Sequence, residues 1–355
     1  MPIRLTDEQK SAIRYILKKI KTDQVVKLGG YAGTGKSTII RVLKQYLPRF
    51  SVCAYTGKAA NVLRKKKVGE TSTIHSLIYR GLPQKDGTII WQLIDRYELD
   101  CDGFIIDEAS MVSEEIYFDL LSFGKPIICI GDHGQLEPIG TSFNLMATPD
   151  VKLEQIHRNA NEIAYFANHL RNGFTPQSFH AEKQVQIIDF NLIEDKHLAN
   201  TDQVICAFNK TRVDINERVR RHLKINFAYI AKGEKIMCLR NNKFLRLFNG
   251  LQGIVTEVHK DDSFSFISDD KEFYEKISYN PNVFGQVAYD WTTDREEEYK
   301  NPFDYAYGIT GHKSQGDEWG SIIVVAQRND KWDSSKWNYT VASRAKYGLI
   351  WGKQN

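Results

Sequence analysis

Hydrophobic positions follow two patterns along the chain. In the first, apolar residues recur at helical spacing shortly after Thr6, which predicts an amphipathic helix capped by that threonine. These residues are Ile13, Ile16, Leu17 and Ile20. In the second, short and solidly apolar runs alternate with helical or loop stretches, as is typical of strands buried on both faces of a parallel sheet. The runs are VVKL (25–28), VCAY (52–55), GFII (103–106), IICI (127–130), VICAF (204–208), IIVVA (322–326) and GLIW (348–351).

The runs fall into two separated sets, which predicts two α/β lobes. Two stretches do not fit the alternation. Residues 80–100 contain LPQKDGTIIW, a turn-rich piece that predicts a small hairpin insertion in the first lobe. Residues 233–300 contain short β segments and the turn signal Asn249-Gly250, which predict a small β-barrel inserted in the second lobe. The expected domains are 1–79 with 101–150, the insertion 80–100, 151–232 with 302–355, and the insertion 233–301.

Composition adds only broad limits. Of 355 residues, 42% are hydrophobic, which suffices for sizeable cores, and the net charge of +4 is a weak hint of a polyanionic partner. The five cysteines contain no CxxC pair, so neither a zinc site nor a disulfide framework is expected. The polar N-terminus and the lack of a long apolar run favour a soluble intracellular protein without a membrane partner.

The segment Gly30–Ser37, GYAGTGKS, matches the phosphate-binding pattern GxxxxGK[ST] and lies between an apolar strand and a helical stretch. Backbone N–H groups of such a loop surround phosphate oxygens, the lysine contacts the β- and γ-phosphates, and the serine ligates Mg²⁺. A chance glycine-rich turn is the alternative, and the order of strand, loop, Lys-Ser and helix argues against it. The expected ATP ligands are Gly30, Gly33, Thr34, Gly35, Lys36, Ser37 and Thr38.

A pair of carboxylates, Asp107 and Glu108, follows the apolar run 103–106. At the carboxyl end of a parallel strand, Asp107 is positioned to hold magnesium and Glu108 to activate the attacking water as a general base. Taken alone, such a pair is more often a helix N-terminal cap. Because a phosphate loop lies upstream, the catalytic interpretation of Asp107 and Glu108 is favoured here.

Further motifs occur in a fixed order from Leu5 to Lys346. They are LTDEQ (5–9), AYTGKAA (54–60), TIHS (73–76), GDHGQLEP (131–138), LEQIHR (153–158), YGITGHKSQG (307–316) and YTVASRAK (339–346). Together with the phosphate loop, this order resembles superfamily 1 DNA helicases, and most closely the 5′-to-3′ subgroup of Dda- and RecD-type enzymes. Ser343 is a mild departure, since threonine is usual there.

The resemblance implies roles at the nucleotide. Gln9 would read the adenine edge, Gln135 would sense the γ-phosphate, and Gln315 with Gly316 would face the nucleotide. Thr6 and Gln9 also fit a capping box, and the sequence alone weighs these two interpretations of Gln9 evenly. The alternative for Arg158 and Arg344 is a surface salt bridge. The catalytic set implied is Lys36, Asp107, Glu108, Gln135, Arg158 and Arg344.

The same resemblance implies contacts to the backbone of single-stranded DNA, because hydroxyl, amide and ammonium groups suit phosphates. A lone histidine such as His75 is more often a buried residue with its hydrogen bonds satisfied, but its Thr-x-His-Ser setting favours the strand. The expected DNA ligands are Thr56, Lys58, Thr73, His75, Thr310, His312 and Lys313.

At the level of the whole chain, the resemblance implies two RecA-like lobes, a wedge at 80–100 and an SH3-like insertion at 233–301. Trp91 is a candidate for the tip of that wedge, although a lone tryptophan is more often a core residue. It implies a monomeric enzyme that uses ATP and Mg²⁺, moves 5′-to-3′ on single strands and unwinds tailed duplexes as its lobes close and open. A translocase or RNA-remodelling ATPase that does not separate DNA strands is one alternative. A nucleotide-gated binding module without turnover is another, and Lys36, Glu108, Gln135 and Arg344 argue against it.

Overall fold

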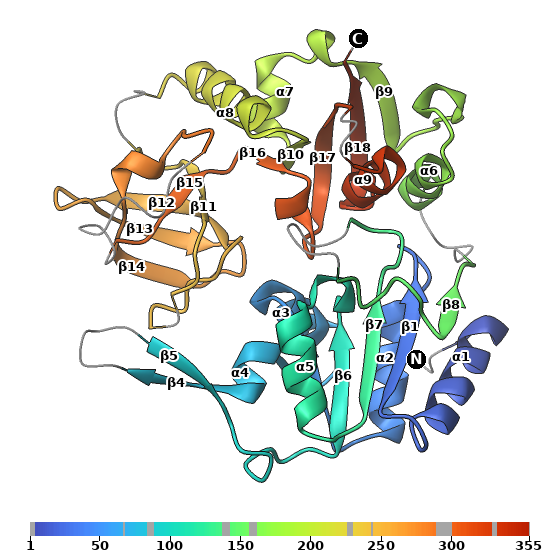
Figure 1. Ribbon diagram of the computed structural model, residues 1–355. Helices are drawn as coiled ribbons and strands as arrows, with labels where there is room; N and C mark the ends of the chain where they lie inside the picture. The colour runs from blue at the N-terminus through green and yellow to red at the C-terminus, as the bar shows by residue number, and fades with distance from the viewer. Residues whose placement is uncertain are drawn as a thin grey trace. The chain divides into compact units, whose positions relative to one another are not determined.

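The computed structural model divides the chain into two compact units, Met1–Ala160 (unit 1) and Asn161–Asn355 (unit 2) (Figure 1). It describes residues 4–66, 68–83, 89–136, 143–155, 162–225, 230–242, 244–288, 300–328 and 332–354. Each unit is built on a parallel sheet of its own. This confirms the two α/β lobes expected from the two sets of apolar runs.

Unit 1 contains a six-stranded parallel sheet with the strand order β3-β2-β6-β7-β1-β8. The strands are β1 (Val25–Gly30), β2 (Phe50–Ala54), β3 (Thr71–Thr73), β6 (Gly103–Asp107), β7 (Ile127–Gly131) and β8 (Val151–Leu153). The four strands predicted in this unit are all present. Strands β3 and β8, of three residues each, were not predicted, and β8 pairs with β1 although it follows residue 150.

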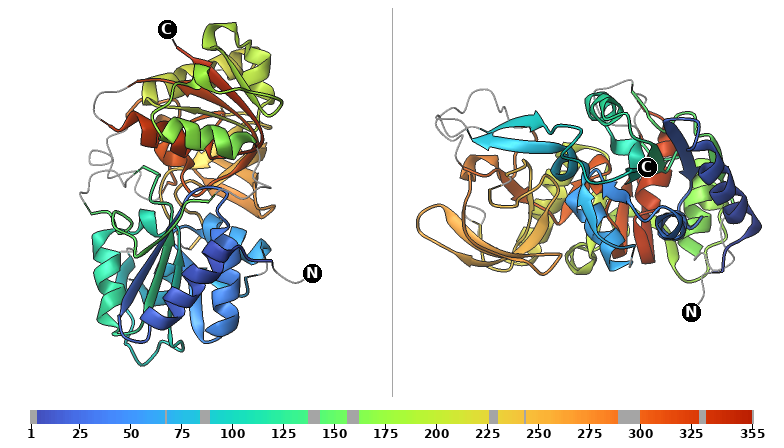
Figure 2. Two further views of the ribbon diagram at one scale, coloured as in Figure 1. Left: turned by 90° about the vertical axis from the view of Figure 1, so that its right-hand side faces the viewer. Right: turned by 90° about the horizontal axis from the view of Figure 1, so that it is seen from below.

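Helices cover both faces of this sheet, as Figure 2 shows. They are α1 (Asp7–Lys19), α2 (Lys36–Tyr46), α3 (Gly57–Lys65), α4 (Ile74–Ile78) and α5 (Glu114–Ser122). One apolar cluster packs α1, α2 and α3 against the sheet, and a second packs α4 and α5. The predicted first helix is confirmed: Thr6 caps α1, and Ile13 and Ile16 are buried.

The insertion in unit 1 is an antiparallel hairpin of β4 (Tyr79–Pro83) and β5 (Ile89–Leu93), as the sequence predicted. Trp91 pairs with Gly81 in the middle of β5 and is 39% exposed. The prediction that Trp91 forms the tip of the hairpin is therefore wrong, because its strand continues to Ile89 before the turn. The turn, residues 84–88, lies outside the described residues.

Unit 2 contains a five-stranded parallel sheet with the order β16-β10-β17-β18-β9. Its strands are β9 (Val185–Asp189), β10 (Gln203–Cys206), β16 (Gly308–Thr310), β17 (Trp319–Ala326) and β18 (Ala345–Lys353). Its helices are α6 (Glu162–Arg171), α7 (Asp195–Asn200), α8 (Asn209–His222) and α9 (Ser334–Ala342), with a short 3-10 helix η5 (His312–Ser314). The predicted strands β10, β17 and β18 are present, whereas β9 and β16 were not predicted.

An antiparallel sheet, the β insertion, interrupts unit 2 between α8 and β16, with the order β14-β13-β12-β11-β15. Its strands are β11 (Lys235–Cys238), β12 (Gln252–Val258), β13 (Ser263–Ser268), β14 (Phe273–Ser278) and β15 (Phe303–Tyr305). An isolated bridge between Tyr279 and Asn301 joins the chain just after β14 to the chain just before β15, so the two edges of the sheet approach each other. The β insertion has its own aromatic core, which includes Phe264, Phe266 and Phe303.

Two buried ion pairs fasten the β insertion to α8. The Nε atom of Arg220 donates to Glu234 at 2.6 Å, and its guanidinium lies 4.0 Å from the centre of the Tyr305 ring. Arg212 pairs with Asp304 on β15. Both carboxylates are almost fully buried, so these pairs fix where the β insertion meets the parallel sheet of unit 2.

Within the described ranges, none of the helices combines the length and apolarity needed to span a bilayer. The same ranges hold no group of three or more His, Cys, Asp or Glu side chains arranged to bind a metal ion. All five cysteines are buried and free.

Candidate functional site

The phosphate loop of unit 1 runs from the end of β1 to the first residue of α2. Gly33 and Gly35 have φ angles of 81° and 84°, left-handed values that glycine tolerates without strain. A Cβ atom at Gly30 would lie 2.7 Å from the Thr34 hydroxyl oxygen. The glycines therefore permit the tight turn that joins β1 to α2.

Lys36, the first residue of α2, folds back over this loop. Its ammonium donates to the carbonyl oxygens of Gly30 at 2.7 Å and Tyr31 at 3.1 Å. It also lies 3.6 Å from a carboxylate oxygen of Asp132 in the loop after β7. The lysine is thus held by protein acceptors at the position where a phosphate group would compete for it.

Two carboxylates follow β6. Burial, together with the neighbouring Glu108 carboxylate, raises the pKa of Asp107 to about 7, while the positive charge of Lys36 acts in the opposite direction. Glu108 has a φ of 53°, a left-handed conformation that is uncommon for a residue with a side chain. Its Oε2 atom and the Ser110 hydroxyl are buried and have no hydrogen-bond partner among the described residues.

These groups fit a divalent cation with its attendant water. The Ser37 hydroxyl and the Asp107 carboxylate are oxygen donors of the kind that Mg²⁺ prefers. Buried polar atoms without partners are rare in folded proteins, so the Glu108 and Ser110 oxygens indicate room for a polar ligand. Asp107 ends β6 within electrostatic range of Lys36, and the predicted roles of Asp107 and Glu108 stay predictions.

The loop after β7 joins the phosphate loop through Asp132. This carboxylate accepts hydrogen bonds from the backbone N–H of Gly134 and from Nε2 of Gln135, and it faces the Lys36 ammonium. Gln135 is buried, and its Oε1 atom has no partner in the described part of the chain. The structure thus brings the predicted residues Lys36 and Gln135 together.

Three residues at this junction were not among the predicted site residues. Asp132 carries the link, and it could have been found from the Gly-Asp pair that opens its motif. The rings of Tyr31, in the phosphate loop, and His133 are in contact, with their centres 4.3 Å apart and their planes tilted by 33°. No local pattern predicts this contact, because the two residues are about 100 positions apart in the sequence.

Gln9 forms the capping box that the sequence allowed as one of two interpretations. Its Oε1 accepts from the Thr6 backbone at 3.1 Å, and the Thr6 hydroxyl accepts from the Gln9 backbone. Its Nε2 donates to the Thr34 carbonyl at 3.0 Å, and the side chain is buried. Gln9 therefore ties α1 to the phosphate loop, and its predicted contact with adenine stays a prediction.

The candidate strand ligands of unit 1 follow β2 and β3. The hydroxyls of Thr56 and Thr73 cap α3 and α4 by accepting from the backbone N–H groups of Ala59 and Ser76. Strand register places Ala54 beside both Thr73 and Asp107, so these motifs share one carboxyl edge of the sheet with the phosphate loop. The order of strands puts them toward the β3 end of that edge.

His75 on α4 lies between two tyrosines. Its ring centre is 6.2 Å from that of Tyr55 and 5.5 Å from that of Tyr79, where β4 begins. The Tyr79 hydroxyl in turn donates to Asp119 on α5. His75 is half-buried. The aromatic contacts fit the interpretation of His75 as a packed residue, while the accessible part of its ring leaves the proposed strand contact open.

In unit 2, Arg344 is 4% exposed, and within the described part of the chain it forms no surface salt bridge of the kind weighed for it. Its guanidinium donates to the carbonyl oxygens of Thr340 and Asp317 and to the Ser343 hydroxyl, at 2.9, 3.2 and 2.9 Å. Asp317 follows Gln315 and Gly316 directly. The structure therefore brings Arg344 close to the segment that was predicted to face the nucleotide.

The remaining strand candidates follow β16. Thr310 ends this strand, and His312 and Lys313 form the start of η5. Burial lowers the pKa of His312 and that of Lys313. The Lys313 ammonium donates to Oδ1 of Asn249 at 2.6 Å, which connects this motif to a turn of the β insertion.

Some predicted residues cannot be placed. Arg158 and the Glu137-Pro138 end of its neighbouring motif lie outside the described residues. The backbone of Lys58 belongs to α3, whereas its side chain lies outside the described part of the structure.

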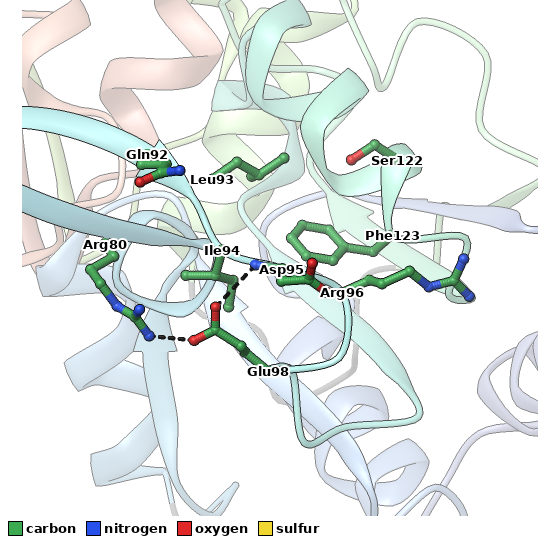
Figure 3. A pocket seen from close by; sticks show the side chains of 9 residues that line it. All are labelled: Arg80, Gln92, Leu93, Ile94, Asp95, Arg96, Glu98, Ser122 and Phe123. Carbon is green, nitrogen blue, oxygen red and sulfur yellow. Dashed lines mark hydrogen bonds and ion pairs between the residues drawn. The ribbon is translucent and has the colours of Figure 1, made fainter.

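A pocket of about 480 Å³ lies at the root of the hairpin in unit 1 (Figure 3). Arg80 and Glu98 form an ion pair across it, and Glu98 also accepts from the backbone of Asp95, whereas Arg96 extends away from that pair. None of the site residues predicted from the sequence lines the pocket. The pocket lies where the hairpin joins the rest of unit 1.

The class of the protein follows from its phosphate loop, its paired carboxylates and its parallel sheets. Residues 4–190 match the AAA domain family, and the chain belongs to that family. It is also distantly homologous, across nearly its whole length, to RecD2 and Pif1 helicases of the 5′-to-3′ group of superfamily 1.

Two curated relatives illustrate this homology. The RecD2 DNA helicase of Deinococcus radiodurans is 24% identical over 96% of this chain and 48% of its own length. The Pif1 DNA helicase of Campylobacter jejuni is 27% identical over 84% of this chain and 82% of its own length. The chain thus spans about half of RecD2, and it spans 30% of a conjugal transfer protein TraA of Sinorhizobium fredii.

Solved structures share the fold. A Bacteroides Pif1 structure bound to single-stranded DNA has a TM-score of 0.60 at 20% identity, covering 99% of this chain and 92% of that one. A structure of two coordinating Pif1 helicases at forked DNA has a TM-score of 0.62 at 22% identity, covering 98% and 92%. The fold of the chain is therefore Pif1-like.

Proposed function

We propose that this protein is an ATP-dependent DNA helicase that moves 5′-to-3′ on single-stranded DNA and unwinds duplex DNA. The observation that carries this proposal is the contact chain from Lys36 through Asp132 to Gln135. It connects the phosphate loop to the loop that would sense the γ-phosphate. The homology to RecD2 and Pif1 helicases supports the direction and the substrate.

The chemistry of hydrolysis falls to groups of unit 1. Lys36 exchanges its carbonyl partners for the β- and γ-phosphates, and Gln9, Gly30, Gly33, Thr34, Gly35 and Thr38 surround the nucleotide. Ser37 and Asp107 hold Mg²⁺, which when bound neutralises charge on the phosphates. Glu108, with a buried oxygen that lacks a partner, takes the proton from the attacking water.

Unit 2 contributes positive charge to the γ-phosphate. Among the described residues, Arg344 donates to carbonyl and hydroxyl oxygens and to no carboxylate, so none of these carboxylates has to release it before it can contact a phosphate. Arg158 is proposed for the same charge clamp on its motif alone. Gln315 and Gly316, two residues before Asp317, would face the nucleotide with Arg344.

The strand contacts are proposed for Thr56, Lys58, Thr73 and His75 in unit 1, and for Thr310, His312 and Lys313 in unit 2. Their hydroxyl, imidazole and ammonium groups suit phosphates and do not read base sequence. Because γ-phosphate contacts exist only when ATP is bound, hydrolysis would change the grip of the two units in turn.

The proposed domains keep the boundaries expected from the sequence. Residues 1–79 with 101–150 and residues 151–232 with 302–355 are the RecA-like lobes 1A and 2A, although β8 (Val151–Leu153) pairs in the sheet of unit 1 and β15 (Phe303–Tyr305) pairs in the sheet of the β insertion. The hairpin at 80–100 is the 1B wedge. The β insertion, with 233–301 as its expected bounds, is an SH3-like 2B element. We expect a monomer to be the active form.

DNA-stimulated phosphate release tests the ATPase. We expect oligothymidine to stimulate wild-type turnover, and we expect Glu108→Gln to reduce it by about 100-fold or more, because a general base contributes about 10²–10⁴-fold. Equal rates for the wild type and Glu108→Gln would instead favour a nucleotide-gated module without turnover.

A directional assay tests the helicase. Duplexes with a 5′ tail, a 3′ tail and blunt ends are offered with ATP, and we expect strand displacement from the 5′-tailed substrate only. Displacement from the 3′-tailed substrate alone would reverse the proposed polarity. ATP turnover without displacement from any substrate would favour a translocase or an RNA-remodelling ATPase.

A further inference from the structure

Lys66 reaches the candidate magnesium site from outside every motif. It is the C-cap residue of α3, and its ammonium donates to the Ser37 hydroxyl oxygen at 3.1 Å. Its charge also acts on Asp107, where it opposes the effect of burial. Lys66 therefore contacts one of the two proposed magnesium ligands and lies within electrostatic range of the other.

We propose that Lys66 is a positioning residue that occupies the magnesium side of the site while the nucleotide is absent, and that it must leave before Mg²⁺ can bind. This inference rests on the proposed ATPase function. An ammonium and Mg²⁺ compete for the same oxygen donors, and two cations at one hydroxyl repel each other. Lys66 thus keeps the site neutralised at rest and lowers its affinity for the metal.

The surroundings of Lys66 allow this exchange. The side chain is exposed at the end of a nine-residue helix, so its ammonium can swing into solvent without unpacking the core. The core positions of α3 are Ala59, Ala60 and Leu63, which pack on the sheet. Lys36, by contrast, is held from three sides inside the loop, so the two lysines have separate tasks.

The exposure of Lys66 limits how much its ammonium can change the affinity of the site for Mg²⁺. Ion pairs and charged hydrogen bonds at exposed positions contribute modest free energies, which correspond to a change of roughly two- to fivefold in an equilibrium constant. Removal of the Lys66 ammonium should therefore lower the concentration of Mg²⁺ needed for half-saturation by roughly two- to fivefold.

The test measures binding and needs no turnover. A fluorescent ADP analogue is bound to the full chain, and its signal is followed as MgCl₂ is added, for the wild type, Lys66→Met, Lys66→Arg and Lys18→Met. Lys18 is exposed on α1, about 13 Å along the helix from Gln9, and controls for the loss of one positive charge. Binding of the analogue in EDTA is measured first, so that any direct contact of Lys66 with phosphate is separated from the metal dependence.

We expect half-saturation at lower Mg²⁺ for Lys66→Met, and values close to the wild type for Lys66→Arg and Lys18→Met. If Lys66→Met needs the same Mg²⁺ concentration as the wild type for half-saturation, or a higher one, the inference is overturned. A wild-type chain that binds no ADP analogue at any Mg²⁺ concentration contradicts the proposed function instead. The two failures are therefore distinguishable.

Discussion

Asp107 shows how a proposed metal ligand can oppose the stability of the fold that holds it. Its carboxyl lies next to Glu108, and desolvation raises its pKa to about 7, above the value of about 3.8 that is usual for this group in an unfolded chain. The folded state therefore binds the proton more tightly, and the stability that Asp107 contributes falls as the pH rises from about 4 through 7. A neutral side chain of the same shape avoids this loss.

Replacing this carboxyl gives the first prediction. Asp107→Asn should raise the melting temperature of the protein without nucleotide or metal at pH 8 by at least about 2–4 °C, since about 1 kcal/mol shifts a domain of this size by that amount. The gain should be smaller at pH 5, where the folded wild type is already protonated. Calorimetry at both pH values checks this, with the exposed Asp102→Asn as control. An equal gain at both pH values would contradict the raised pKa.

We expect Lys36 to act in ATP hydrolysis and not in DNA binding. Its ammonium contacts the phosphate loop and Asp132, and it contacts none of the strand candidates whose side chains the structure describes. Lys36→Ala should therefore abolish ATP hydrolysis while changing the affinity for a fluorescent oligothymidine less than about threefold. Anisotropy titration beside phosphate release measures both. Loss of strand binding together with turnover would contradict this division of labour.

At the scale of elements, α8 is the support of the β insertion. Arg220 and Glu234 are 3% and 0% exposed at the side chain, and the ring of Tyr305 covers the guanidinium. Removing one partner of such a pair leaves a buried charge without compensation, which costs about 3–5 kcal/mol. The pair therefore fixes the β insertion on α8 only while both members are present.

Glu234→Ala should destabilise the protein by about 3 kcal/mol or more in urea denaturation. The matched control is Glu194→Ala, which removes a carboxylate paired with Lys196 on the surface of the same unit and should leave the midpoint nearly unchanged. A similar midpoint for both variants would show that the Arg220–Glu234 pair does not hold the β insertion in place.

The turn at Asn249 supports a proposed strand ligand. Since Asn249 holds the ammonium of Lys313, Asn249→Ala should weaken binding of oligothymidine by roughly two- to tenfold, as expected for the loss of a hydrogen bond that contributes about 0.5–1.5 kcal/mol. Lys313→Ala should weaken it more. Asn191→Ala, an exposed change elsewhere in unit 2, serves as control in the same anisotropy titration. Wild-type affinity in Asn249→Ala would mean that Lys313 needs no such support.

The elements that could be predicted from the sequence are those with a recognisable pattern in their own local sequence. Runs such as IICI and GFII are apolar on both faces, so burial alone identifies β7 and β6. The strands that were not predicted, such as β3 (TST) and β16 (GIT), are three residues long and partly polar. They are strands because a neighbour pairs with them, and pairing across the chain leaves no trace in local composition.

At the scale of the whole molecule, the candidate site likewise combines residues that a local sequence pattern predicts with contacts that it does not predict. The motif positions of the phosphate loop, Asp107 and Gln135 could be predicted from the sequence, because each lies at or just after the end of an apolar strand. The contacts of Asp132 with Lys36 and of Lys66 with Ser37 join distant segments and could not be. They depend on the order β2-β6-β7-β1, which brings separate strand ends to one edge.

The proposed function requires that nucleotide held by unit 1 engages Arg344 of unit 2. The native cysteines are all buried, so fluorophores can be placed selectively at Tyr46→Cys and Leu192→Cys, exposed positions in the two units. Addition of ADP with aluminium fluoride should change the energy transfer between them. Arg344→Ala should remove most of that change while the nucleotide still binds. A nucleotide response that persists in Arg344→Ala would exclude this role.

The strands through which the chain enters and leaves the β insertion, β11 and β15, pair side by side, with Met237 opposite Asp304. Such adjacent ends make the insertion an exchangeable cassette, since a longer or shorter version could be spliced in without displacing β10 or β16. Evolution and protein engineering would face the same constraint: a graft has to bring its own equivalents of Glu234 and Asp304, or Arg220 and Arg212 on α8 each lose a buried carboxylate partner.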